Sequence, residues 1–577
     1  MAQKEAIEGL SCPTKIPHWR LVWDQSLVTA DVRDYPYPGS GTEDDPYCVS
    51  WIPNDPRDPM NFTNSKKWLI TGLVASSTLG VALVSSAFTG GSSAIMAEYD
   101  VSHEVVTLGV SLFVLGFAIG PLLWAPLSEV FGRQKLFITT YGAMSLFNAA
   151  VTGSQNIQTI LVLRFFAGAF GASPLTNAGG VIADMFAPSQ RGLAMALFAS
   201  APFLGPVIGP LVGGFLGMTA GWRWVLGFLA TFSGVLWIVG STLIPETYAP
   251  VLLRRRARVL SKITGMAYRS NLDIDRAPVQ LRAAFATALS RPWKLLFREP
   301  IVFLLSMYMA IIYGTLYMLF GAFPIVYEQH RGWNQGIGGL SFLGVLVGML
   351  FALVYTVPDN KRYIKAILKN DGRAIPEARL PPSILGGIAI PVGLFWFAWT
   401  NSPSLPFMAS IAGGVPFGFG MVLVFLSVLN YLIDAYTIYA ASVLAASAVV
   451  RSLFGAAFPL FTTQMFQNLG IHWASCIPAF LSLACVPFPF ICYQYGKEIR
   501  RRCKYAAEAD DFMRKLSEKS KEEVPEINGQ IDDSNPGTHV ARPESPPPIL
   551  SRRSIHRVPT VEYEGNPFDI DRVNTRD

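Results

Sequence analysis

Twelve apolar stretches, each close to twenty residues long, constrain the fold of this chain more than any other feature. The hydrocarbon core of a bilayer is about 30 Å thick, and an α-helix needs roughly 20 apolar residues to cross it. Stretches of this length therefore predict membrane-spanning helices. The predicted spans cover residues 68–90, 105–125, 136–153, 157–180, 192–216, 223–244, 301–323, 337–357, 382–400, 405–428, 438–462 and 472–494.

The basic residues between the spans orient the predicted bundle. Lys and Arg are preferentially kept on the cytoplasmic side of membrane proteins. With a cytoplasmic N-terminus, the loops on the opposite side hold little basic charge beyond Arg223 and Arg331. We therefore expect a multi-pass membrane protein with both termini in the cytoplasm. Basic residues on the predicted cytoplasmic side include Lys66, Lys67, Arg133, Lys135, Arg191, Arg254, Arg255, Arg256, Arg258, Lys361, Arg362, Arg500, Arg501 and Arg502.

A long polar segment divides the spans into two sets of six. The sequence predicts an all-α membrane protein with 12 transmembrane helices in two six-helix bundles, with a cleft between them suited to alternating access. The tails are polar and Pro-rich, and we expect them to be disordered. The predicted units are an N-terminal tail at 1–65, bundles at 66–244 and 301–496, a central cytoplasmic loop at 245–300 and a C-terminal tail at 497–577.

The composition excludes several other classes of function. Only 15% of the 577 residues are charged, and the net charge of +6 arises in loops that flank spans rather than on a nucleic-acid-binding face. No phosphate-cradling Gly-x-x-x-x-Gly-Lys-Ser/Thr motif is present, so ATP drive is not expected. The six cysteines lack metal-ligand spacing. We expect no enzymatic activity, catalytic residue, cofactor, metal or nucleic-acid partner.

Five short motifs occur at defined positions relative to the spans. They are APLSEVFGR at 125–133, LRFFAG at 163–168, GPVIGPLVGG at 205–214, PETYAPVLL at 245–253 and NYLIDAY at 430–436. Together they resemble the signatures of the major facilitator superfamily, and within it the fungal 12-span drug:H+ antiporters, over about residues 51–502. Ala125, Glu129 and Gln134 depart from the general superfamily pattern, but these departures are typical of the fungal branch.

The resemblance implies that the turn after the second span acts as a gate. Gly132 permits a tight turn or a close helix approach. Glu129 would be stabilised near the positive N-terminal end of another helix, and the resemblance implies that this helix is the eleventh span. Arg133 could pair with Asp184. The alternative is that these charges only anchor helix ends at the membrane interface. The predicted gating residues are Glu129, Gly132, Arg133, Asp184, Arg191 and Asp434.

Arg164 in the fourth span is the candidate for proton coupling. A charged arginine within the bilayer costs at least about 2.5 kcal/mol, so it should face protein or a water-filled cavity. The resemblance implies a fixed positive charge that tunes the protonation of a neighbouring acid, because arginine itself does not release its proton. The alternative is that Arg164 snorkels to the outer interface. Which acid carries the proton stays open.

Glycines and prolines dominate the fifth span. Glycines clear a helix face for close packing in lipid, and prolines bend the helix and free backbone carbonyls. The resemblance associates this motif with antiport, whereas generic helix packing is the alternative. The residues of this predicted antiporter-signature helix are Gly205, Pro206, Gly209, Pro210, Gly213 and Gly214.

The seventh span supplies candidate cargo contacts. Tyr313, Tyr317 and Phe320 fall on one helical face, where their rings would suit a planar or amphipathic organic molecule. The alternative is that these rings face lipid or only pack against other helices.

The resemblance therefore implies a monomeric, proton-coupled exporter of small organic compounds, either drugs or a self-made secondary metabolite, in the fungal plasma membrane. Its expected partners are the cargo, protons and the bilayer. An uptake permease for a nutrient or organic acid, a polyamine exporter and a transporter-shaped sensor are the alternatives. No cluster of acids suited to a polycation is evident, which weighs against polyamines.

Overall fold

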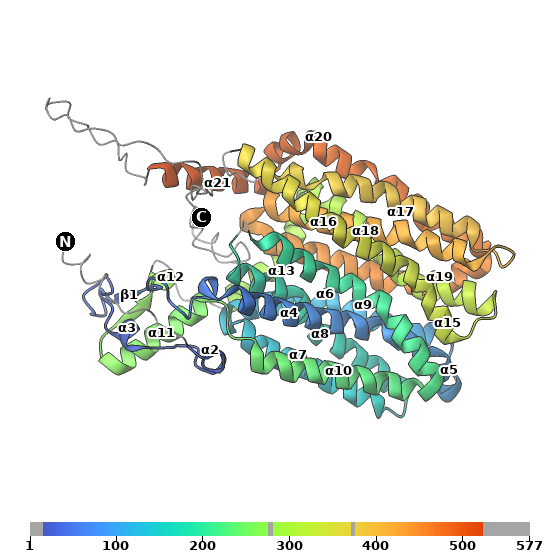
Figure 1. Ribbon diagram of the computed structural model, residues 1–577, viewed down its shortest axis with the longest axis horizontal. Coiled ribbons are helices and arrows are strands. Elements are labelled where there is room, and N and C mark those ends of the chain that lie inside the picture. Colours follow the sequence, from blue (N-terminus) through green and yellow to red (C-terminus); the bar gives the residue numbers. More distant parts are fainter. Residues whose placement is uncertain (1–15, 188–189, 275–280, 371–374, 523–577) are drawn as a thin grey trace, which may run out of the picture.

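The computed structural model describes residues 16–187, 190–274, 281–370 and 375–522, whose helices form one elongated bundle (Figure 1). The first half contains α2 (His18–Trp23), α3 (Ala30–Arg33), β1 (Tyr47–Val49), η1 (Pro59–Asn61), α4 (Asn64–Ala87), η2 (Phe88–Gly91), α5 (Ser92–Tyr99), α6 (His103–Phe131), α7 (Arg133–Thr152), α8 (Ile157–Met185), α9 (Arg191–Ala220) and α10 (Trp222–Leu243). The connecting segment contains α11 (Ala249–Thr264), β2 (Tyr268–Ser270), α12 (Asn271–Ile274) and α13 (Leu281–Arg298). The second half contains α14 (Pro300–Phe323), η3 (Pro324–Gln329), α15 (Gln335–Gly339), η4 (Leu340–Phe342), α16 (Leu343–Lys369), η5 (Pro376–Arg379), α17 (Pro381–Thr400), α18 (Phe407–Ala435), η6 (Thr437–Tyr439), α19 (Ala440–Cys485), α20 (Pro487–Arg502) and α21 (Lys504–Glu522).

The two halves repeat one packing scheme. In the first half, α4 packs on α9, α6 on α8, and α7 on both α8 and α10. In the second half, α14 packs on α19, α16 on α18, and α17 on both α18 and α19. Each bundle also contacts the other in an equivalent way, since α6 packs on α19 and α9 packs on α16. The predicted all-α membrane fold of two bundles is confirmed.

Ten helical stretches within the described residues are long and apolar enough to cross a membrane, and they contain eleven of the twelve predicted spans. One of the ten, Thr437–Arg502, contains two predicted spans. The helix of this stretch is interrupted at Gly470, which has φ 73° and ψ 167°. Tyr439, near the start of the stretch, donates a hydrogen bond to Glu508, which lies just beyond its end. The chain must therefore reverse direction within the stretch. The twelfth predicted span corresponds to α7, whose polar first turn lowers its hydropathy although it packs between α8 and α10.

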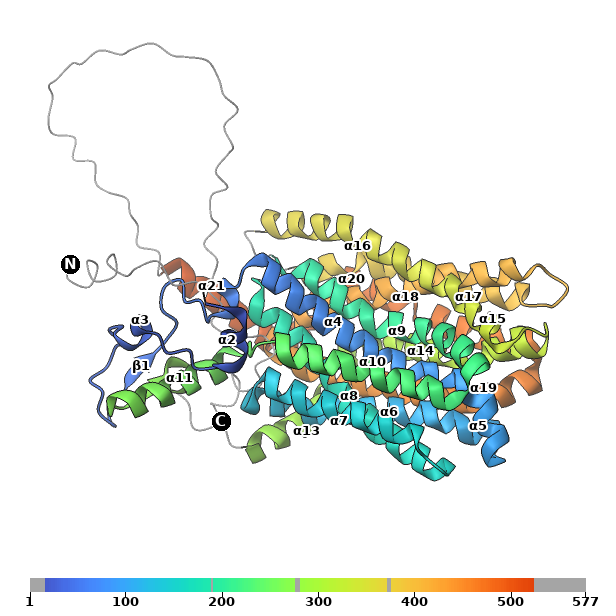
Figure 2. The same ribbon diagram turned by 60° about the horizontal axis from the view of Figure 1, so that its bottom comes forward.

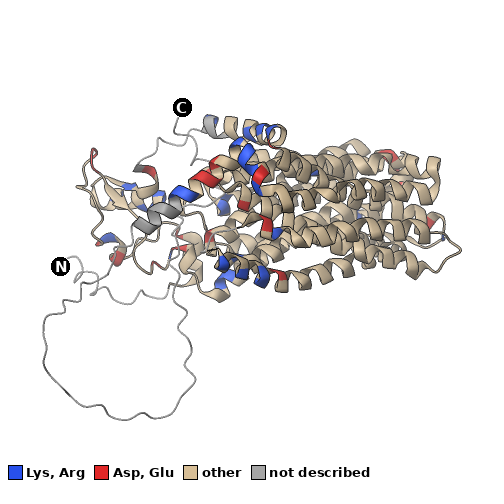
Figure 3. Cartoon of the chain, turned by 90° about the horizontal axis from the view of Figure 1, so that it is seen from above, with Lys and Arg blue, Asp and Glu red and all other residues tan. Residues whose placement is uncertain are grey.

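Charged residues concentrate at one end of the bundle, which we call the charged end (Figure 3). It carries α2, α11, α13 and α21, whereas the opposite far end carries α5 and α15 (Figures 1 and 2). Large apolar side chains on the sides between the ends stay exposed, including Leu146 at 71% and Val354 at 70%. Such a belt is what a lipid-facing surface requires.

The expectation of a disordered N-terminal tail over 1–65 is wrong for residues 16–65. Strand β1 pairs in parallel with β2, Tyr47 opposite Tyr268, and Val49 is buried with Leu253 of α11. Asp55 also forms a fully buried ion pair with Arg256 at 2.5 Å. The tail is polar by composition, but it completes a small core together with the connecting segment. We call residues 16–62 with α11, β2 and α12 the cap.

The predicted C-terminal tail and central loop also differ from expectation. Residues 497–522 continue as α20 and α21, in which Ala506 and Ala509 are buried. The backbone N–H of Tyr505 donates to Oε1 of Glu299 at 3.0 Å, which fixes the start of α21 against the start of α14. The connecting segment is largely helical rather than a loop. Residues 1–15 and 523–577 lie outside the described residues.

Candidate functional site

The turn between α6 and α7 is built around Gly132 at the charged end. Gly132 has φ +95°, a backbone conformation that L-residues with a side chain rarely adopt. A Cβ atom at this position would overlap the carboxylate of Glu246. The glycine is therefore required both by the backbone conformation and by the close approach of the segment that follows α10.

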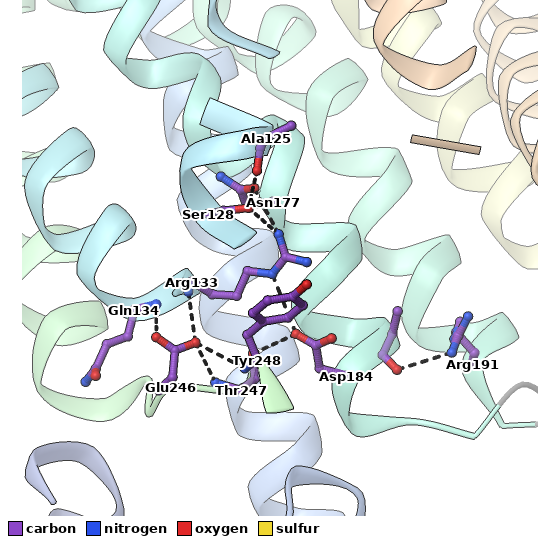
Figure 4. Close-up of polar contacts among 11 residues, drawn as sticks. Ala125, Ser128, Arg133, Gln134, Asn177, Asp184, Arg191, Glu246, Thr247 and Tyr248 are labelled. Atoms are coloured by element: carbon purple, nitrogen blue, oxygen red, sulfur yellow. Dashed lines mark hydrogen bonds and ion pairs between the residues drawn. The ribbon is translucent and has the colours of Figure 1, made fainter. Parts of the chain in front are cut away.

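Glu246 fixes this turn, although it was not among the predicted gating residues. Its carboxylate accepts the backbone N–H of Arg133 at 2.8 Å and of Gln134 at 3.2 Å, at the start of α7 (Figure 4). It also accepts the N–H of Thr247 and of Tyr248, both at 3.1 Å. A negative charge at a helix N-terminus satisfies free N–H groups and opposes the helix dipole.

The guanidinium of Arg133 contacts the predicted partner. Its Nε lies 3.7 Å from Oδ2 of Asp184, and both side chains are buried (Figure 4). Its Nη1 donates to the hydroxyl of Ser128 and to Oδ1 of Asn177, the latter at 3.4 Å. The guanidinium also lies 4.8 Å from the ring centroid of Tyr248. The geometry of the predicted Arg133–Asp184 pair is thus present, within a larger network that ties α6, α7 and α8 together.

The remaining predicted gating residues surround this network. Asp184 also accepts a hydrogen bond from the Thr247 hydroxyl at 3.1 Å. Arg191, at the start of α9, donates to the carbonyls at the end of α8 and lies in the electrostatic field of both Asp184 and Asp434. Glu129 is buried in the last turn of α6, where it contributes to the electrostatic field at Arg133.

Asp434 belongs to the second half. It accepts hydrogen bonds from Tyr363 at 2.7 Å and from Arg379 at 3.0 Å. The halves meet beside it, because a Cβ on Gly192 of α9 would lie 2.6 Å from Oδ1 of Asn360 in α16. A cavity of about 50 Å³ lies at this junction of α9, α16 and α18. Arg191 of the first half therefore interacts electrostatically with acidic groups of both halves.

Arg164 is buried at the centre of the first bundle, so it does not snorkel. Its three donor groups bond the carbonyls of Gly109, Val84 and Ser85, each at 3.0 Å. Its Cζ also lies 4.5 Å from the ring centroids of Phe88 and Phe113. The two α4 carbonyls lie where α4 gives way to the 3₁₀ turn η2. The arginine therefore joins α4, α6 and α8 by satisfying backbone acceptors, and none of these bonds goes to an acid.

The fifth-span motif lies along α9, and its glycines face two different neighbours. Side chains at Gly205, Gly209 and Gly213 would overlap α4, the last against the carbonyl of Ala87. A Cβ on Gly214 would instead lie 2.7 Å from the carbonyl oxygen of Gln335 in α15. A Cβ on Gly339 of α15 would likewise lie 2.6 Å from the carbonyl oxygen of Pro210.

The amide of Gln335 also donates to the carbonyl of Thr89 in η2 at 3.3 Å. Pro206 lies inside α9 between Gly205 and Gly209, and the helix continues through it. The motif therefore packs α9 on α4 within the first half and against α15 of the second half at the far end.

The predicted cargo aromatics gather between the two halves. Tyr313, Tyr317 and Phe320 are all buried, which excludes the lipid-facing alternative. Tyr317 shares a 2.8 Å hydrogen bond with the hydroxyl of Ser85 in the first half, and Tyr313 donates to Tyr317 at 3.3 Å. The ring of Phe320 lies 5.0 Å from that of Tyr317.

Three further residues of this centre were missed by the sequence analysis. Phe203 of α9 and Phe425 of α18 have ring centroids 4.4 Å apart, and both stand near the ring of Tyr313. Arg451 of α19 lies over Tyr313 and Phe425. No local sequence signal distinguishes Arg451 or the two phenylalanines from the many other residues of their kind in the chain.

Comparisons with known proteins agree with this architecture. The family model described as Major Facilitator Superfamily matches residues 74–459. The chain is 64% identical to "MFS-type efflux pump MFS2" of Trichophyton rubrum, covering 100% of this chain and 98% of that protein. It is 62% identical to "Major facilitator superfamily multidrug transporter mdrA" of Aspergillus fumigatus, covering 98% of this chain and 97% of the relative.

Among solved structures, the proton:xylose symporter XylE bound to 6-bromo-6-deoxy-D-glucose matches with a TM-score of 0.54. The alignment covers 75% of this chain and 97% of that chain at 15% identity. At this level of identity, the similarity supports the fold and no statement about function.

Proposed function

The chain belongs to the major facilitator superfamily, and we propose that it is a proton-coupled exporter of small organic compounds that works by alternating access. The names of two relatives, an efflux pump and a multidrug transporter, support export of organic compounds. The single observation that carries the mechanism is the arrangement of contacts between the halves. They meet at the charged end, at the far end and at a central aromatic cluster between the two ends.

In this mechanism the far-end contact between α9 and α15 closes the outer side. It depends on backbone atoms of Gln335 and Pro210 approaching glycines, so a small rotation of one bundle separates it. At the charged end Arg191 interacts electrostatically with Asp184 of its own half and with Asp434 of the second half, and a rotation in the opposite sense separates Arg191 from Asp434. Cargo enters from one side and leaves from the other as the two contacts alternate.

The proton acts at a carboxylate in this proposal. Arg164 keeps its proton at physiological pH and bonds three carbonyls, so its role is to hold α4, α6 and α8 together beside Ser85. Asp184 is a carboxylate whose contact with Arg133 adjoins the junction of the halves. Protonation of Asp184 removes its negative charge and thereby weakens that contact, which couples proton uptake to opening of the charged end.

The orientation follows from charge. The charged end carries the basic clusters Arg254–Arg258 and Arg500–Arg502, so it lies in the cytoplasm together with both termini. We propose the plasma membrane as the location and a monomer as the functional unit.

The direction of transport is tested in a deletion strain. Loss of an exporter raises the intracellular level of its cargo relative to the parent strain, and loss of an uptake permease lowers it. Metabolite profiles of cells and medium, with the wild-type gene restored as control, distinguish the two. A polyamine exporter is the weakest alternative. Polyamines are polycations, and the positive side chains of Arg164 and Arg451 both lie in the interior of the protein.

A further inference from the structure

A second arginine lies midway across the bundle, in surroundings unlike those of Arg164. Arg451 is eleven residues past the start of α19 at Ala440, which places it about 16 Å along that helix, near the middle of a bilayer core of about 30 Å. Its Cζ lies 5.2 Å from the ring centroid of Tyr313 and 5.7 Å from that of Phe425. Phe203 of α9 completes a group of three rings, which together with Arg451 we call the central box.

The central box combines residues of both halves. Phe203 comes from the first bundle, whereas Tyr313, Phe425 and Arg451 come from three helices of the second. The same Tyr313 donates to Tyr317, which bonds Ser85 of the first bundle. A molecule held in the central box would therefore contact both moving parts, as a transported cargo must.

The charge of Arg451 is not compensated within the described part of the chain. No ion pair there joins it to a carboxylate, and its Nε is buried without a hydrogen-bond partner. Arg451 is only half-buried, whereas Arg164 is fully buried with all three donor groups bonded to carbonyls. A guanidinium stays charged at physiological pH, and an unpaired charge at this depth is costly. The cation–π contacts with Tyr313 and Phe425 offset only part of the cost of burying this charge.

We propose that Arg451 is the anion-binding residue of the cargo site, and that the preferred cargo joins a carboxylate or similar acidic group to a flat apolar body. A carboxylate can accept two parallel hydrogen bonds from a guanidinium, and the three rings suit an apolar body beside it. This inference rests on the proposed export function and narrows its substrate class. The positive charge of Arg451 also disfavours cationic cargo.

Three probes that share one ring system test the charge preference: 2-naphthoate, 2-naphthamide and 2-naphthylmethylammonium. Their affinities are measured by calorimetry on the purified full-length protein. A hydrogen-bonded charge pair is worth at least about tenfold in affinity, so wild type should bind the naphthoate about tenfold or more tighter than the amide and should bind the cation weakest.

Variants then assign the preference to one residue. Arg451→Gln should bring the naphthoate and naphthamide affinities together, and Arg451→Lys should give an intermediate ratio because it keeps the charge but loses the planar fork. Arg331→Gln is the matched control. Arg331 lies near the far end, where it bonds the carbonyls of Ser402 and Leu405, and its loss should leave the ratio unchanged. Size-exclusion profiles establish which variants are folded, and the lysine variant gives an independent reading.

Two results would overturn the assignment: equal affinities of wild type for the naphthoate and the amide, or a wild-type ratio of the two affinities in Arg451→Gln. Vesicles loaded with each probe under an imposed pH gradient separate this failure from failure of export itself. Movement of the neutral amide without preference for the naphthoate overturns only the role of Arg451. Movement of none of the three overturns it together with the proposed export of such compounds.

Discussion

Replacement of Glu246 by alanine should loosen the charged end more than removal of any exposed acid. Its carboxylate accepts four backbone N–H groups from two separate segments, those of Arg133 and Gln134 and those of Thr247 and Tyr248. Glu246 is fully buried, so water does not readily replace the lost acceptor. An unmet buried donor costs more than the bond itself contributes.

The magnitude follows from those four bonds. At about 1 kcal/mol for each, their loss amounts to about 4 kcal/mol, or about a thousandfold in the equilibrium between a fixed and a released turn. The hydrogen bond from Arg57 to the carbonyl oxygen of Glu246 persists, because it involves the backbone. Glu246→Gln should lose about half as much, since the amide keeps one acceptor oxygen but turns an NH₂ group toward donors.

Thermal unfolding of the purified protein, followed by tryptophan fluorescence, provides the assay. The midpoint should fall in the order wild type, Glu246→Gln, Glu246→Ala. The matched control is Glu498→Ala, because Glu498 is 57% exposed and pairs with Arg502 at 3.3 Å, a contact worth under about 1 kcal/mol. If Glu246→Ala unfolded at the same temperature as Glu498→Ala, the role assigned to the four bonds would be refuted.

Other substitutions test other parts of the account. Arg164→Ala should abolish export and reduce the yield of folded protein, because three buried carbonyls lose their donors; export at the wild-type rate would end its assigned role. Gly209→Val should force α9 away from α4, since even a Cβ would overlap the hydroxyl of Ser86, and an unchanged thermal midpoint would contradict that close packing. Burial raises the pKa of Asp58 in the cap to about 6, above the value of about 4 for an unfolded chain. Its protonated form therefore stabilises the fold fully below about pH 4, and this contribution is lost as the pH rises through about 6. Asp58→Asn should remove that slope from a plot of thermal midpoint against pH, and an equal slope in the variant would show that another group is responsible.

The sequence was informative where the determining signal is local. Long apolar runs and the placement of Lys and Arg need no tertiary contact, so the two bundles could be predicted. The Arg133–Asp184 pair was expected from the family resemblance, and the shared face of Tyr313 and Tyr317 from their spacing. Of the twelve predicted spans only α7 is not among the long apolar helices of the described residues, and the break at Gly470 lies between the last two predicted spans, 438–462 and 472–494.

The remainder depends on partners that are distant in the chain. Glu246 bonds Arg133, 113 residues away in the sequence, and Asp55 bonds Arg256, 201 residues away. Neither contact can be predicted from local composition. For the same reason a polar, Pro-rich N-terminal segment was expected to be disordered although it completes the cap. Arg451 was not predicted as a site residue, because helical periodicity does not show which side chains of the two bundles lie close together in the folded protein.

Distances between spin labels would test the central claim most directly, namely that the two ends open in alternation. In a cysteine-free background, one label pair at Leu193 and Lys361 reports the charged end, and a second pair at Met218 and Ile337 reports the far end, all four positions being exposed. When the pH or the cargo concentration is changed, the account requires one distance to lengthen as the other shortens. If both distances stayed fixed, or lengthened together, the proposal of two bundles rocking about a central site would be contradicted.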